Sequence, residues 1–242
     1  MHPVDPDESP GVHARPSLPG PFGVSSRRAV PVALSGRGVE KRAEIARRAA
    51  EIFARQGAAR TSLEDIATAA GVKREGVYYY FRDKWEILHE IIRPQSDALL
   101  RSMERLASLN MAPTARLALA IGSHLQRFNP TYIEMTVALR ELQGSDPAPE
   151  MIALRRVWKE YERHWITLFR QGQEAGEFAR EQDPKVMAFA ILGMCNAVSG
   201  WYQPGGEIAI EDLVRSYTAI ALQGVAGAGR ARTGRTPRKP AR

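Results

Sequence analysis

Apolar residues along the middle of the chain repeat at the spacing of an α-helix. Ile45, Ala49, Ile52 and Phe53 stand at positions i, i+4, i+7 and i+8, which fall on one face of a helix. Gly57 follows them as a helix-stop residue. No segment alternates apolar and polar residues as a half-buried strand does. The pattern therefore predicts an all-α fold without a sheet.

Residues that start and stop helices divide this region into a series of predicted helices. The hydroxyl of Thr61 or Ser62 is expected to cap the second helix, and Glu64 and Asp65 in its first turn favour the helix dipole. Pro94 is expected to kink a long helix, because proline removes an internal hydrogen bond. The predicted helices span 38–56, 63–70, 74–81, 84–108, 113–127, 131–143, 150–175, 184–202 and 210–224.

The two ends of the chain lack this periodicity. Residues 1–36 are rich in Pro, Gly and Ser and contain no continuous apolar stretch of the kind found in secretory signals. Residues 226–242 consist mainly of Gly, Ala, Arg and Pro. Both ends are expected to be disordered, as an N-terminal extension and a basic tail, because they bury too little apolar surface to fold.

Positive charge is distributed unevenly along the chain, which has a formal net charge of +7 over 242 residues. Residues 37–84 hold eleven basic and seven acidic residues, and residues 230–242 hold five Arg and one Lys with no acid. A positive field over the first third of the body is typical of a module that faces DNA. The basic tail has two open interpretations: it adds nonspecific attraction to phosphates, or it only aids solubility.

The stretch 63–81 has the spacing of a helix-turn-helix. Ala67 is small where a second helix must cross closely, and Gly71 permits the left-handed backbone of a tight turn. Ile66, Val72 and Val77 are spaced to fill the small core between the two helices. The second helix of such a unit enters the major groove of DNA. Residues 37–84 are therefore predicted to form a three-helix DNA-binding domain.

The exposed side chains of this motif have the chemistry that DNA contacts require. Lys73 or Arg74 can donate to guanine or to phosphate, and Glu75 can accept from cytosine. Tyr78 and Tyr79 can donate to phosphates and pack on sugars. Phosphate contacts are also expected at the start of the second and fourth helices. The predicted DNA-binding residues are Thr61, Ser62, Lys73, Arg74, Glu75, Gly76, Tyr78, Tyr79 and Lys84.

About 50 residues in this region resemble, without a gap, the N-terminal domain of the TetR family of transcriptional regulators. The resemblance implies a homodimer on a near-palindromic operator. It also implies a C-terminal helical domain that holds a small ligand and releases DNA when it is occupied. The residues that carry it are Arg42, Ile45, Ala49, Phe53, Gly57, Thr61, Ser62, Leu63, Ile66, Ala67, Ala70, Gly71, Val72, Gly76, Val77, Tyr78, Phe81, Lys84 and Leu88.

Residues 85–225 are predicted to form a larger helical ligand-binding and dimerisation domain. Trp158, Tyr161 and Trp165 share one helix face, which is either core or dimer contact, or the wall of an apolar pocket. The preceding helix offers further side chains to the same cavity. The candidate ligand-binding residues are Met135, Leu139, Arg140, Tyr161, Trp165, Leu192 and Asn196.

The segment 186–202 carries no charge, yet it is too short and too interrupted by Gly and polar residues to span a membrane. A four-helix bundle made by helices 150–175 and 184–202 of two subunits would bury it, so a homodimer is expected there. Trp201, Tyr202, Pro204, Gly205 and Gly206 resemble a stretch in the TetR branch that responds to acyl-CoA thioesters.

The sequence therefore predicts a ligand-responsive repressor that binds double-stranded DNA and is released by an acyl-CoA or another hydrophobic effector. One alternative is the same fold sensing a drug-like cation for efflux control, with Glu134 or Glu141 as the carboxylate. Another is a nonspecific architectural DNA-binding protein. The histidines are scattered and Cys195 is expected to be an inert buried thiol, so no enzyme, metal site or cofactor is predicted. The expected location is the cytoplasm.

Overall fold

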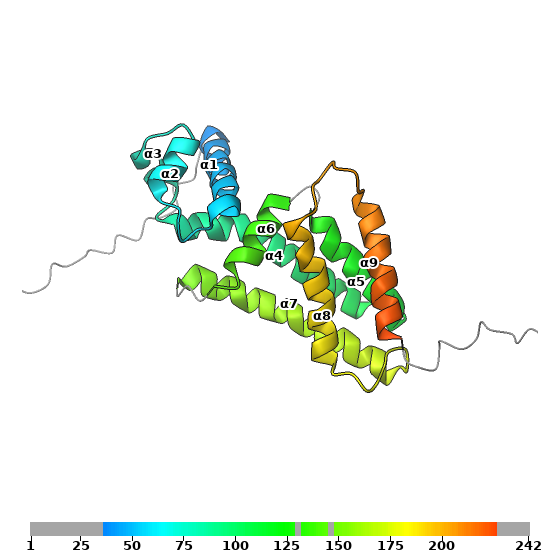
Figure 1. The fold of residues 1–242 in the computed structure, drawn as a ribbon. Coiled ribbons are helices and arrows are strands. Elements are labelled where there is room, and N and C mark those ends of the chain that lie inside the picture. Colours follow the sequence, from blue (N-terminus) through cyan, green and yellow to red (C-terminus); the bar gives the residue numbers. More distant parts are fainter. Residues whose placement is uncertain (1–35, 129–131, 145–147, 227–242) are drawn as a thin grey trace, which may run out of the picture. The chain divides into compact units, whose positions relative to one another are not determined.

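The computed structural model describes residues 36–128, 132–144 and 148–226, and helices dominate this part of the chain (Figure 1). These residues include no β-strand, and one isolated bridge joins Phe178 to Ala226. The predicted all-α fold is confirmed. Most of the two predicted disordered ends, 1–35 and 227–242, lies outside the described residues. No described helix is long and apolar enough to cross a membrane.

Three N-terminal helices form the predicted helix-turn-helix domain: α1 is Gly36–Gln56, α2 is Leu63–Ala69 and α3 is Arg74–Tyr80. Ser62 caps α2 by accepting from the backbone N–H of Asp65, whose carboxylate accepts in return from the backbone N–H of Ser62. This reciprocal arrangement satisfies two backbone donors that the helix start leaves free. Of the two hydroxyls predicted to cap α2, the one of Ser62 performs this role.

The remaining helices agree closely with the predicted ranges. They are α4 Lys84–Ser108, α5 Pro113–Leu125, α6 Tyr132–Glu141, α7 Pro149–Glu174, α8 Pro184–Asn196 and α9 Ile210–Val225. The structure differs where tighter turns follow α5 and α8, because Gln126–Phe128 and Ala197–Gly200 are 3₁₀-helices. The helix predicted over 184–202 therefore ends as an α-helix at Asn196. Helix α4 continues through Pro94.

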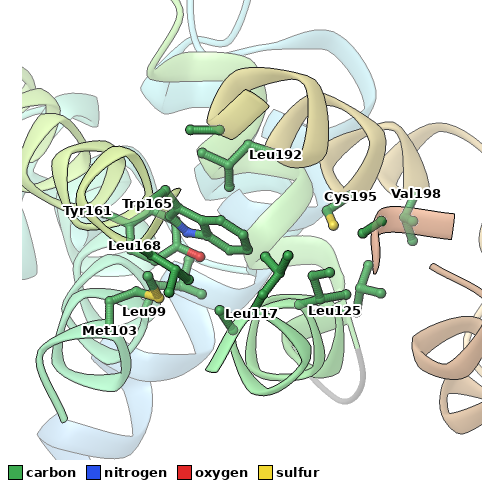
Figure 2. Close-up of a cluster of buried hydrophobic side chains, with 14 of the residues drawn as sticks. Leu99, Met103, Leu117, Leu125, Tyr161, Trp165, Leu168, Leu192, Cys195 and Val198 are labelled. Atoms are coloured by element: carbon green, nitrogen blue, oxygen red, sulfur yellow. The ribbon is translucent and has the colours of Figure 1, made fainter. Parts of the chain in front are cut away.

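The C-terminal core lies between α4, α5, α7 and α8. Helix α7 packs along α4 and along α8, and α5 packs along α9 (Figure 1). Figure 2 shows Leu99 of α4, Leu117 of α5, and Tyr161 and Trp165 of α7 converging with Leu192 of α8. All five are buried. The core thus brings together helices that are far apart in the sequence.

A second hydrophobic cluster joins the DNA-binding helices to the C-terminal domain. It contains buried residues of α1 to α4 such as Ile45 and Phe53, and it continues into Val137 and Ala138 of α6 and Leu154 of α7. The boundary expected between the two domains, at residues 84 and 85, therefore does not separate two hydrophobic cores, because this cluster contains residues from both sides of it. Movement of α6 would act directly on side chains that support the helix-turn-helix, because packed cores have few voids that could absorb it.

Candidate DNA-binding surface and ligand pocket

Helix α3 presents one face to solvent because its other face is anchored in the domain core. Val77 and the following Phe81 are buried, whereas Tyr78 is 49% exposed and Tyr79 is 67% exposed. The side chains of three further predicted DNA contacts on this segment are also exposed, namely Lys73, Arg74 and Glu75. Large exposed tyrosines with neighbouring cations suit a surface that contacts phosphates and base edges.

Arg74 and Tyr78 form a pair on the exposed face of α3. The guanidinium Nη2 of Arg74 donates to the Tyr78 hydroxyl at 3.2 Å, and its Cζ lies 5.6 Å from the centre of the tyrosine ring. The two residues are one helical turn apart, so the helix itself brings them together. The hydrogen bond with Tyr78 also raises the pKa of Arg74. Both side chains are thereby held close together on the same turn.

The turn before α3 has the geometry expected from its sequence. Gly71 has a φ of 63°, a left-handed conformation that side chains other than glycine adopt at a cost. Ala67 is buried on α2, which packs against α3. Gly76 is partly buried beside Val72, so it lies toward the inner side of α3. Ala67 thus packs between the two helices, and Gly71 provides the turn that joins them.

The polar groups of Thr61 and Lys84 form hydrogen bonds to the backbone of the DNA-binding domain. Thr61 is buried and its hydroxyl donates to the carbonyl oxygen of Gly57 at 2.8 Å. The Lys84 ammonium donates to three carbonyl oxygens, of Ala58, Ala59 and Thr61, at 2.7, 3.3 and 3.1 Å. Because three donors are all that an ammonium has, this geometry does not favour the phosphate contacts predicted for either residue.

Arg42 holds the end of α3 in place, a role that the sequence pattern did not reveal. Its guanidinium donates to the carbonyl oxygen of Tyr80 and to the carboxylate of Glu90 on α4. Its Cζ lies 4.0 Å from the centre of the Phe81 ring. Arg42 therefore connects α1, α3 and α4 at one point. An arginine on the helix face next to the apolar stripe was the available signal.

A pocket of about 310 Å³ opens in the C-terminal domain between α6, α7 and α8. Among the predicted ligand-binding residues, four line it: Leu139, Tyr161, Leu192 and Asn196. Its volume falls at the lower end of the range for small-molecule sites. On the aromatic face of α7, Tyr161 borders the pocket. Trp165 of the same face is buried in the core, as Figure 2 shows.

Three predicted ligand-binding residues lie outside the pocket lining. Met135 and Trp165 are fully buried in the C-terminal core. Arg140 extends to the DNA-binding domain, where its Nη1 donates to the carbonyl oxygen of Ala54 at 3.2 Å. It follows Leu139 directly on the same helix, and adjacent helical positions point in different directions. This rotation along α6 separates Arg140 from the pocket.

The pocket also has charged lining residues that the sequence pattern did not single out. Arg155, Lys159 and Glu162 of α7 border it. Burial raises the pKa of Glu162, and the charges of Lys159 and Lys185 oppose this shift. The three stand at i, i+4 and i+7 beside the aromatic stripe of the same helix. That spacing was the signal that could have revealed them.

The sequence matches two family models that together span most of the described chain. One, described as "Bacterial regulatory proteins, tetR family", matches residues 45–91. The other, described as "Tetracyclin repressor-like, C-terminal domain", matches residues 110–225. The first contains the whole of α2 and α3 and the second contains α5 to α9. The matches therefore cover both halves of the architecture.

Similar proteins are transcriptional regulators. The HTH-type transcriptional repressor KstR2 of Rhodococcus jostii is 25% identical over 187 residues, covering 77% of this chain and 91% of that protein. The structure of ketosteroid transcriptional regulator KstR2 of Mycobacterium tuberculosis has a TM-score of 0.71 at 25% identity, covering 77% of this chain and 95% of that one. AibR, solved in complex with isovaleryl coenzyme A and operator DNA, shares the fold with a TM-score of 0.63 at 21% identity, covering 74% and 97%. The chain belongs to the TetR family and is a DNA-binding transcriptional repressor of the helix-turn-helix type.

Proposed function

We propose that this repressor binds a near-palindromic operator as a homodimer and releases it when an acidic, largely apolar effector of the acyl-CoA class occupies the C-terminal pocket. The observation that carries this proposal is the composition of the pocket. Apolar side chains such as Leu139 and Leu192 line it together with Arg155 and Lys159. Apolar walls suit an acyl group, and two cations suit a phosphate or carboxylate.

The charges of the pocket favour an anion over the drug-like cation of the alternative hypothesis. Among the described residues, its lining contains Lys159, the carboxylate of Glu162, and Arg155, whose guanidinium also donates to the carbonyl oxygen of Gly144 at 3.3 Å. Neither carboxylate expected to bind a cation lines the pocket, and Glu141 instead accepts from the backbone N–H of Ala58 at 3.0 Å. The similarity in fold to AibR, solved with an acyl-CoA and operator DNA, agrees with this choice.

Helix α6 provides the connection between the pocket and the DNA-binding domain. Ala138 and Leu139 line the pocket. The next two residues, Arg140 and Glu141, hydrogen-bond with Ala54 near the end of α1 and with Ala58 just after it. An effector that displaces α6 would therefore also displace α1 and the helix-turn-helix packed on it. We infer that ligand binding changes the position of α3 by this route.

A homodimer interface on α8 and α9 fits the exposed apolar side chains. Val186 on α8 is 65% exposed and Ile220 on α9 is 57% exposed. The outward side chains of α7 are mostly charged, such as Arg156 and Arg163. The proposed four-helix bundle therefore pairs α8 with α9, whereas the sequence suggested helices 150–175 and 184–202. Large exposed apolar patches are typical of subunit interfaces.

Binding to the DNA upstream of the protein's own gene tests this function. Labelled upstream DNA should be retarded and random DNA should not, and isovaleryl-CoA or octanoyl-CoA should release it. An acyl-CoA at a hundred times its Kd should also add about 2.7 kcal/mol of stability. Equal binding to random DNA would support the architectural alternative, and release by a cationic dye but by no CoA ester would support the cation alternative.

A matched pair of variants on α7 isolates the pocket. Lys159→Gln should weaken acyl-CoA binding because it removes a cation from the pocket lining. Arg163→Gln, one turn further along and paired with Glu160 at the surface, should leave it unchanged. Equal effects of the two substitutions would contradict the assignment of the pocket.

The dimer interface is tested separately by sedimentation. The double variant Val186→Glu with Ile220→Glu should dissociate the dimer.

A further inference from the structure

A buried histidine lies behind the pocket and contacts a residue that lines it. His124 of α5 is fully buried, and its Nδ1 lies 2.9 Å from the hydroxyl of Tyr161 on α7. Burial lowers the pKa of His124 to about 4, and the side chain of Asn196 on α8 opposes this shift by hydrogen bonding. A group that raises a histidine pKa in this way approaches as an acceptor. The ring is therefore neutral at pH 7, and the Asn196 side chain is its second hydrogen-bonding neighbour.

Trp165 favours one direction of donation along the row formed by Tyr161, His124 and Asn196. Its Nε1–H can only donate. Burial raises the pKa of Tyr161, and Trp165 opposes this by approaching the tyrosine oxygen as a donor. With Trp165 donating to the tyrosine oxygen, the Tyr161 hydroxyl would donate to Nδ1 of His124, 2.9 Å away, and the ring proton would then lie on Nε2. The side chain of Asn196, which opposes the lowered pKa of His124, offers Oδ1 as an acceptor for that proton.

Three atoms of this row lack a partner at full hydrogen-bonding geometry in the described structure. They are Nε1 of Trp165, Nε2 of His124 and Oδ1 of Asn196, and all three are buried. Unsatisfied buried polar atoms are costly, so a ligand group that pairs with this row has a favourable contact to gain. Asn196 is the member of the row that connects it to the pocket, which it lines together with Tyr161.

The amide of Asn196 presents a donor to the pocket. Its Oδ1 is buried without a partner, whereas Nδ2 is not among the buried unpartnered atoms of the described residues. The two atoms branch from the same carbon, so an amide that turns Oδ1 toward His124 leaves the two N–H groups of Nδ2 for the pocket. Neighbouring lining residues such as Leu192 and Phe189 are apolar. A ligand oxygen that enters this part of the pocket therefore meets a donor in apolar surroundings.

We propose that Asn196 Nδ2 donates to a carbonyl oxygen located within the apolar part of the effector, and that His124, Tyr161 and Trp165 are positioning residues that hold the amide in this orientation. The inference rests on the proposed function, because it assumes an acidic effector in the same pocket. A carbonyl oxygen can only accept a hydrogen bond. It therefore suits Nδ2 of Asn196, which can only donate. A plain alkyl chain would leave Nδ2 unpaired.

Octanoate and its 4-, 5-, 6- and 7-oxo isomers test this inference by calorimetric titration of the full chain. At least one isomer should bind about threefold to tenfold more tightly than octanoate, the gain expected from one hydrogen bond. Asn196→Ala should abolish this preference, so that octanoate and the preferred oxo isomer bind the variant with equal affinity. Gln171→Ala, which removes an exposed amide of α7 outside the pocket lining, should preserve it.

The positioning role has a separate readout. Imidazole ¹⁵N shifts of His124 should show a protonated Nε2 and an unprotonated Nδ1 at neutral pH, and His124→Phe should remove the preference for the oxo isomer. The opposite tautomer, or a preference that survives His124→Phe, would overturn the row. If Asn196→Ala does not fold, Asn196→Ser replaces it in the titration.

The outcomes separate this inference from the function on which it rests. If octanoate and every oxo isomer bind equally, the carbonyl assignment is overturned and the acidic effector remains. If no acid binds and no CoA ester releases the DNA, both are overturned. Release by CoA esters with a clear preference for one oxo isomer supports both.

Discussion

Arg140 of α6 donates through Nη1 to the carbonyl oxygen of Ala54, 3.2 Å away near the end of α1. A cation at this place is favourable because the last carbonyls of a helix carry partial negative charge. The preceding residue, Leu139, lines the pocket. Two adjacent residues of α6 thus face the pocket and the DNA-binding domain. Under the proposed function, substitutions here can separate effector binding from the response of the DNA-binding domain.

Arg140→Ala should weaken the response to effector while leaving effector binding intact. The substitution removes a contact between α6 and α1 without changing a residue of the pocket lining. Operator binding followed by fluorescence anisotropy should therefore require more isovaleryl-CoA for release, although the Kd for the CoA ester is unchanged. Arg101→Ala on the exposed side of α4 is the control. Normal release by the Arg140 variant would show that coupling runs elsewhere.

Arg74→Ala should lower operator affinity by about 1–3 kcal/mol and reduce the preference for operator over random DNA, as expected when a base contact is lost. The side chain is exposed, so thermal stability should change little. Arg47→Ala is the matched control, because Arg47 is an exposed arginine on α1 that pairs with Glu51. A uniform loss on all DNA sequences would instead assign Arg74 to a phosphate.

Lys84→Met should destabilise the DNA-binding domain by about 1–3 kcal/mol, because it leaves the carbonyls of Ala58, Ala59 and Thr61 without their common donor. Urea unfolding measures this loss. The salt dependence of DNA binding should be unaffected once folding is accounted for. A stable variant whose salt dependence falls by about one counterion would restore the phosphate contact that the sequence suggested.

His124 should make folding stability decrease toward acid. Its pKa is about 4 in the folded chain and 6.5 ordinarily, so between these values the unfolded chain binds a proton that the folded chain does not. Stability is therefore lost as the pH falls from about 6.5 toward 4, by up to about 3 kcal/mol. Burial raises the pKa of neighbouring Tyr161 and raises that of Cys195 to about 12, so neither titrates in this range.

Urea unfolding of the wild type and of His124→Phe at pH 7 and pH 5 measures this contribution. The wild type should lose more stability between the two values than the variant does. Carboxylates whose pKa is lowered, such as Glu86, contribute to both proteins alike and cancel in the comparison. Equal losses in the two proteins would mean that His124 is accessible to protons in the folded state.

The amino-acid sequence by itself determined the helices and the helix-turn-helix. Apolar spacing, capping residues and glycine stops are local signals, and a helix satisfies its backbone hydrogen bonds locally. The exposed face of α3 followed from the same periodicity, since burial of Val77 leaves Tyr78 and Tyr79 outside. The ends of helices were less well determined, and the tighter turn after Asn196 is an example.

Only the tertiary structure decided which side chains from distant helices meet. Arg42 reaches α4, Lys84 reaches the loop before α2, and Arg140 reaches α1 instead of the pocket. The row of His124, Tyr161 and Asn196 draws on three helices. Periodicity indicates which face of a helix is buried, but it does not indicate which other helix packs against that face. Long polar side chains also hydrogen-bond to the nearest unsatisfied carbonyl or carboxylate oxygen. The position of that acceptor depends on the packing of the whole chain.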